Sequence, residues 1–115
     1  MIYDPVGGDV FDESTRCIAF DGRLLVVGFT SGRIPTVSVN MPLIKGFSVI
    51  GVRAGEYGRR FPDRGAENLE AIWDLADQGL IHPRVHAELP LERWREAYDL
   101  LAERRVIGKA VTRLD

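Results

Sequence analysis

Gly-Arg-Leu-Leu-Val-Val-Gly-Phe-Thr, at residues 22–30, is the stretch that decides the fold. Its run from Leu24 to Val27 is continuously apolar and bounded by glycines, as expected of a strand covered on both faces of a parallel sheet. Residues 1–8, Met-Ile-Tyr-Asp-Pro-Val-Gly-Gly, predict a shorter strand from Met1 to Tyr3 that stops at Asp4-Pro5, because proline cannot donate to a ladder. The predicted fold class is therefore α/β.

The segment between these two strands predicts the crossover that parallel neighbours require. Apolar and small residues fall near helical spacing between Asp9 and Phe20, which predicts a short amphipathic helix with Asp9 as its N-cap. One helical turn is expected from Asn40 to Ile44, and a third strand from Phe47 to Val52.

Downstream, residues 53–63 contain three arginines, two glycines and a proline, which predicts a connector without regular structure. A helix is expected from Arg64 to Gln78, because Leu69, Ile72, Trp73 and Ala76 mark one face and Gly79 is a helix stop. The remaining predicted elements are a strand at Val85 to Leu89, a helix at Leu91 to Arg104 and a strand at Val106 to Leu114.

Composition excludes several classes of function. The formal net charge is −2 and no basic stripe dominates, so we expect no nucleic-acid partner. No apolar run reaches the roughly 20 residues of a membrane span, so no membrane association is expected. Cys17 is the only cysteine and has apolar neighbours, which predicts a buried, unreactive thiol in a reducing compartment, the cytoplasm.

Four segments, in order, resemble the medium-chain dehydrogenase/reductase family, most closely its zinc-free quinone oxidoreductase branch. Residues 3–8 resemble the fourth strand of the family's dinucleotide-binding domain and its loop, and residues 22–32 resemble the fifth strand and the loop beside the nicotinamide. Ile-Gly-Val-Arg at 50–53 resembles the sixth strand. Residues 89–97 and Gly-Lys-Ala-Val at 108–111 resemble the family's closing helix and strand.

The resemblance implies the C-terminal half of a Rossmann-type, doubly wound parallel sheet, plus the closing helices and strand of the family's catalytic domain. Residues 1–55 would supply strands 4 to 6, and residues 56–115 the catalytic-domain part. The implied parent is an NAD(P)H-dependent oxidoreductase, with NADP as cofactor, that transfers hydride to a small-molecule quinone or enone. Because the glycine-rich phosphate turn and the N-terminal domain are missing, we expect this C-terminal portion to be inactive alone and to bind cofactor weakly or not at all.

The resemblance also implies the site residues and a partner. Val27, Gly28, Phe29 and Thr30 would line the nicotinamide, Gly7 would meet the ribose, Val52, Arg53 and Ala54 would form another cofactor-side loop, and Lys109 would lie near the pyrophosphate. It implies a homodimer through the strand Phe47–Val52. For Gly7, Gly28 and Gly51, turn and packing geometry is the alternative explanation.

Other candidate sites are weaker. His82 and His86 have ligand spacing only on a helix, whereas Pro83 and Val85 predict extended chain, in which four residues span roughly 13 Å. We therefore predict no metal site and assign no catalytic residue. Asp4 is expected to form a turn or cap a helix rather than act as a catalytic acid. An alternative for the whole chain is a non-enzymatic interaction module that folds by self-association.

Overall fold

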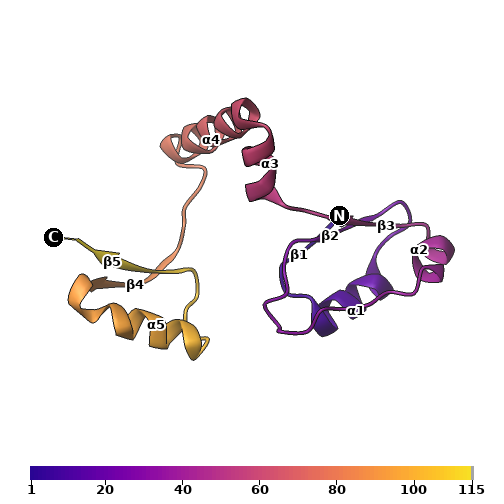
Figure 1. The fold of residues 1–115 in the computed structure, drawn as a ribbon, viewed down its shortest axis with the longest axis horizontal. Helices are drawn as coiled ribbons and strands as arrows, with labels where there is room; N and C mark the ends of the chain where they lie inside the picture. Colours follow the sequence, from indigo (N-terminus) through magenta and orange to yellow (C-terminus); the bar gives the residue numbers. More distant parts are fainter. Residues whose placement is uncertain (115) are drawn as a thin grey trace. The chain divides into compact units, whose positions relative to one another are not determined.

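The computed structural model describes residues 1–114 and contains both helices and strands (Figure 1). Its elements are β1 Ile2–Asp4, α1 Gly8–Cys17, β2 Arg23–Val26, α2 Asn40–Lys45, β3 Ser48–Gly51, α3 Ala54–Arg60, α4 Pro62–Asp77, β4 Val85–Pro90, the 3-10 turn η1 Leu91–Arg93, α5 Trp94–Ala102 and β5 Lys109–Arg113. The chain divides into two compact units, and the boundary between them follows Gly65. The assignment of residues 1–55 and 56–115 to two domains of a larger enzyme stays a prediction.

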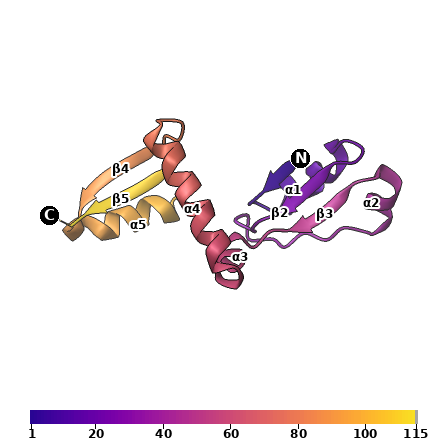
Figure 2. The ribbon, with the colours of Figure 1, turned by 90° about the horizontal axis from the view of Figure 1, so that it is seen from above.

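The first unit is built on a three-stranded parallel sheet with the order β1-β2-β3. Leu24 on the central strand lies in register with Ile2 on one side and Val49 on the other. Helix α1 lies along one face of this sheet (Figure 2). The predicted α/β class, with its parallel strands, is confirmed.

The core of this unit lies on that helix-covered face. Leu24 has no exposed surface, and Phe11, Ile18 and Phe47 pack with it as buried neighbours. The opposite face carries Tyr3, Leu25 and Ile50 in register, and Tyr3 is 64% exposed. The sequence predicted that the apolar run from Leu24 to Val27 is covered on both faces of the sheet. Within the first unit, only one of these faces is covered.

Helix α1 is shorter than predicted, which changes two expectations. Ile18 has an extended ψ of 137° and leaves the helix, so its side chain joins the core. Cys17 therefore ends the helix on the outside and is exposed, and the prediction of a buried thiol was wrong. Asp9 is not the N-cap either, because the helix begins at Gly8 with Gly7 as N-cap and without a side-chain cap.

Residues 53–63 are not the predicted connector, since they contain α3 and the first two residues of α4. Within α3, Glu56 pairs with Arg59 at 2.9 Å and with Arg60 at 3.1 Å, spacings of three and four residues that favour helix. Pro62 occupies the first position of α4, where its missing N–H removes no intrahelical bond. The proline that suggested a loop therefore begins a helix.

The second unit contains a parallel pair of strands, β4 and β5, joined through η1 and α5 (Figure 2). Leu89 and Ala97 are its buried apolar side chains among the residues described. The register shifts between Val85 and Ala87, so β4 contains a bulge. No helix within residues 1–114 is long and apolar enough to cross a bilayer.

Candidate functional site

The carboxyl ends of the three parallel strands bring the predicted cofactor loops of the first unit together. The N–H of Val27 donates to the carbonyl of Asp4 at 2.9 Å, and the N–H of Val52 donates to the carbonyl of Val26 at 2.9 Å. These two bonds continue the sheet ladder one residue past the ends of β2 and β3. Segments 5–8, 27–33 and 52–54 consequently begin at one edge of the sheet, where ligands bind in open α/β sheets.

The first loop is shaped by a buried carboxylate. Asp4 is 2% exposed, and its Oδ1 accepts hydrogen bonds from the N–H groups of Val6 at 2.8 Å and Gly7 at 2.9 Å. This arrangement is a turn in which an aspartate side chain replaces a backbone acceptor. The prediction of a turn-forming role for Asp4 is confirmed.

The second loop is hydrogen-bonded to the first. The N–H of Thr30 donates to the carbonyl of Pro5 at 3.2 Å, as does its Oγ1 at 3.2 Å, and the N–H of Ser31 donates to the carbonyl of Val6 at 3.0 Å. Between Val27 and Thr30, no backbone hydrogen bond within residues 1–114 engages the N–H of Gly28 or Phe29. Those two donors are thus available to a ligand.

Packing excludes a side chain at two of the three glycines of the site. Gly7 has a φ of +67°, and a Cβ there would lie 2.9 Å from Cδ1 of Phe29. A Cβ on Gly28 would lie 3.2 Å from the carbonyl oxygen of Pro5. Turn and packing geometry therefore explains both. At Gly51 a Cβ would meet nothing within 4 Å, so packing does not require glycine there.

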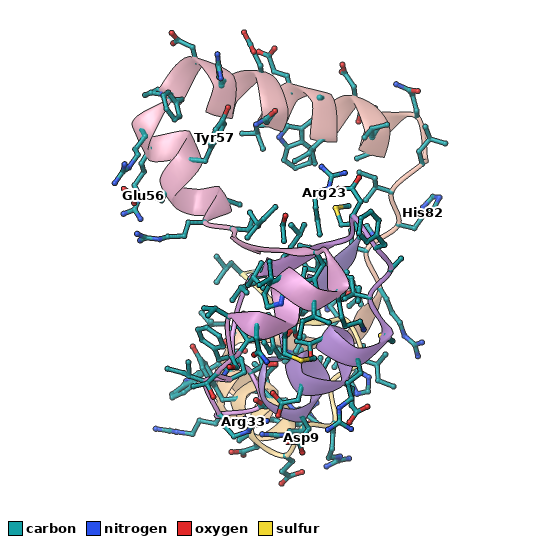
Figure 3. All side chains as sticks on the ribbon, turned by 90° about the vertical axis from the view of Figure 1, so that its right-hand side faces the viewer. Asp9, Arg23, Arg33, Glu56, Tyr57 and His82 are labelled. Carbon is teal, nitrogen blue, oxygen red and sulfur yellow. The ribbon has the colours of Figure 1, made fainter. Side chains whose placement is uncertain are left out.

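Gly51 instead borders an open pocket of about 490 Å³ at the carboxyl end of β3. Its lining residues are Gly51, Val52, Arg53, Ala54, Glu56, Tyr57 and Arg60. Figure 3 shows Glu56 and Tyr57 projecting from α3. All three residues of the predicted third loop, 52–54, line this pocket, whereas the contribution of α3 was missed because no helix was expected here.

Charge in this pocket is concentrated around one carboxylate. Glu56 pairs with Arg59 and Arg60, and Arg53 lies 3.8 Å from its Oε2. Tyr57 accepts a hydrogen bond from Arg64 at 3.2 Å, and this bond raises the pKa of Arg64 above its ordinary value. Arginines thus outnumber carboxylates beside the pocket, which suits an anionic ligand.

Arg33 also lies beside these loops, although it was not predicted as a site residue from the sequence. Its Nη2 donates to Oδ1 of Asp9 at 2.9 Å and to Oδ2 of Asp12 at 2.5 Å. Figure 3 shows Asp9 and Arg33 beside each other. The hydrogen bonds that Arg33 donates, chiefly to Asp12 and secondly to Asp9, raise the pKa of Arg33. Arg33 is therefore fully charged at neutral pH, and its ion pairs with Asp9 and Asp12 are lost only as the pH rises through that raised pKa.

Lys109, the remaining predicted site residue, is not among the residues that the first unit brings together. It begins β5 in the second unit, where its N–H donates to the carbonyl of Arg84 at 2.9 Å. Within residues 1–114, no group of three or more His, Cys, Asp or Glu side chains could hold a metal ion.

Comparison with known proteins places the chain. Residues 1–111 match the family described as zinc-binding dehydrogenase. The chain belongs to this family. The predicted relationship to medium-chain dehydrogenases/reductases and to quinone oxidoreductases is confirmed.

Relatives of this family match nearly the whole chain. It is 36% identical to quinone oxidoreductase-like protein 2 of Mus musculus, covering 96% of this chain and 32% of that protein. A mycobacterial protein solved with NADPH superposes with a TM-score of 0.79 at 27% identity, covering 96% of this chain and 34% of the other. Escherichia coli quinone oxidoreductase, also solved with NADPH, gives a TM-score of 0.74 at 25% identity over the same shares, 96% and 34%. The chain thus spans about a third of the length of these relatives.

Proposed function

We propose that this chain forms the nicotinamide side of the cofactor site in an NADPH-dependent oxidoreductase that reduces a quinone or enone. The observation that carries the proposal is the meeting of three loops at the carboxyl ends of β1, β2 and β3, two of them hydrogen-bonded to each other and the third lining an open pocket. Relatives solved with NADPH support the choice of cofactor.

The residues present fit a nicotinamide. The N–H groups of Gly28 and Phe29 would bind its carboxamide, because no backbone bond within residues 1–114 engages them. Gly7 allows Phe29 to lie close to the first loop, where any Cβ would collide with the ring. Val52, Arg53 and Ala54 would border the ligand from the third loop, beside the space that Gly51 leaves open.

In this proposal the protein orients its ligands and excludes water. When bound, reduced nicotinamide supplies the hydride. Phe29, 41% exposed, would cover one side of the ring and limit access of water. A role for Lys109 near the pyrophosphate stays a prediction from the family resemblance. No side chain of this chain is assigned to proton transfer.

Cofactor binding tests the proposal directly. Without a glycine-rich phosphate turn, we expect NADPH to bind this chain no tighter than about 1 mM, on the order of −4 kcal/mol. In ¹H–¹⁵N spectra of the chain titrated with NADPH, the amides of residues 28–30 and 52–54 should shift together. A Phe29→Asp variant should lose these shifts, because it places a negative charge beside an anionic ligand. Micromolar affinity, or shifts confined to other residues, would contradict the proposal.

Two further features belong to the proposal. We propose that β3 pairs with a second copy of the chain, because β3 hydrogen-bonds only to β2 within residues 1–114 and exposes 37% of Ile50. We also propose a cytoplasmic location, because the single cysteine is exposed and unpaired, as suits a reducing compartment.

A further inference from the structure

The ion pairs of Arg33 join two segments that are distant in sequence. Asp9 and Asp12 are three residues apart on α1, so their carboxylates lie on one face of the helix. Arg33 belongs to the loop after β2 and reaches both carboxylates, at 2.9 Å and 2.5 Å. One nitrogen of the guanidinium, Nη2, thereby ties the loop after β2 to the first helix.

The backbone of Arg33 is held at the same place. Its carbonyl accepts the N–H of Gly8 at 3.1 Å, and its own N–H donates to Oγ of Ser31 at 3.3 Å. Gly32, immediately before it, has a φ of +85°, and a Cβ there would meet nothing within 4 Å. No neighbouring atom therefore restricts the chain at Gly32, whereas hydrogen bonds hold the backbone at Arg33.

The anchored segment directly follows Gly28 and overlaps the proposed nicotinamide contacts at Phe29. The N–H of Gly32 donates to the carbonyl of Phe29 at 2.9 Å, which closes a tight turn over residues 29–32. Hydrogen bonds to the first loop hold the two central residues of this turn, Thr30 and Ser31. Arg33 holds its end.

We infer that Arg33, bridging Asp9 and Asp12, is a positioning residue that keeps the turn at residues 29–32 in the form that presents Gly28 and Phe29 to a nicotinamide. The inference rests on the proposed function. Arg33 and Asp9 are exposed, and exposed ion pairs add little to global stability. The effect of the bridge therefore falls on the population of the binding-competent loop, and apparent affinity falls with that population.

The test uses two variants of opposite charge change in the full 115-residue chain. Arg33→Gln removes a positive charge, whereas the double variant Asp9→Asn, Asp12→Asn removes two negative charges and leaves Arg33 in place. Arg16→Gln is the matched control, because Arg16 pairs with Glu13 on the same helix at 3.4 Å and its removal changes charge as Arg33→Gln does.

NADPH titrations followed at the amides of residues 28–30 supply the binding readout, and exchange of the Gly8 amide reports the loop without ligand. Both bridge variants should weaken binding by about threefold or more, and both should speed exchange at Gly8. Arg33→Lys, which keeps the charge, should fall between Arg33→Gln and wild type. Melting temperatures should match that of Arg16→Gln.

Three results would overturn the inference and leave the proposed function standing. Weaker binding in Arg33→Gln with tighter binding in the double variant would mean that Arg33 attracts the anionic cofactor directly. Unchanged binding in both would mean that the loop holds its form without the bridge. Loss of the folded spectrum in Arg33→Gln would make Arg33 a residue of general stability. A wild-type chain without shifts at residues 28–30 would instead remove the proposed function, and this inference with it.

Discussion

The carboxylate of Asp4 accepts the backbone N–H of Gly7 at 2.9 Å, and this bond joins the last residue of β1 to the N-cap of α1. Because Asp4 and Gly7 are only three residues apart, the bond closes a tight turn between the strand and the crossover helix. Gly7 can follow this path because its φ of +67° is accessible to glycine at little cost. The first cofactor-side loop therefore depends on one buried side chain and one residue without a side chain.

Replacing Asp4 should destabilise the protein strongly. Asp4→Ala leaves the N–H groups of Val6 and Gly7 without their acceptor, and we expect the free energy of unfolding to fall by about 2–4 kcal/mol. Asp4→Asn keeps an acceptor oxygen and should lose about 1 kcal/mol. Urea denaturation of the two variants measures the difference. Equal losses would show that an amide oxygen of the same size cannot replace the carboxylate, so that the negative charge of Asp4 matters as well as its acceptor oxygen.

Substitution of two glycines should change stability to different extents. Gly7→Ala should lower the free energy of unfolding by about 1–3 kcal/mol, because its φ is positive and its Cβ would collide with Phe29. Gly51→Val should change stability by no more than about 0.5 kcal/mol, because nothing lies within 4 Å of its Cβ.

The same Gly51→Val variant should affect ligand binding. Its side chain would project into the pocket that Gly51 borders, so NADPH-induced shifts at residues 52–54 should diminish while those at residues 28–30 persist. Full shifts at both segments would show that the ligand does not use this pocket.

We expect no oxidoreductase turnover by this chain alone. Hydride transfer requires cofactor and substrate to be held together in near-attack geometry, and the chain spans only 32% of its Mus musculus relative. The measurement is oxidation of NADPH in the presence of a simple quinone, with Phe29→Asp as control. Turnover that Phe29→Asp abolishes would disprove this expectation, whereas turnover unaffected by Phe29→Asp would indicate a contaminant.

Self-association through β3 makes a separate prediction. Light scattering over a concentration series should give a dimer, and amides in residues 47–52 should exchange slowly. Ile50→Lys should shift the equilibrium to monomer, because a charged edge resists pairing. Leu114→Lys is the control, since Leu114 is 82% exposed outside this strand. A monomeric wild type with fast exchange at residues 47–52 would mean that the edge is unused.

Local sequence patterns predicted much of the secondary structure correctly. The apolar run at residues 24–27 predicted a parallel strand, and β2 occupies Arg23–Val26 at the centre of the sheet. Where the prediction failed, two local rules competed. Glycines and Pro62 suggested a connector, but Glu56 with its arginines and the tolerance of proline at a first helical position produced α3 and α4.

By itself, the sequence determined which strands form, because burial pattern and turn residues act over a few neighbouring positions, and it determined the family through motifs in order. Only the tertiary structure decided which loops meet. Arg33 reaches carboxylates 24 and 21 residues earlier in the chain, and no local periodicity records that distance. Similarly, Gly51 borders a pocket only because α3 folds beside the end of β3. Parallel strands bring remote loops to one edge, so the site is a property of strand order and register.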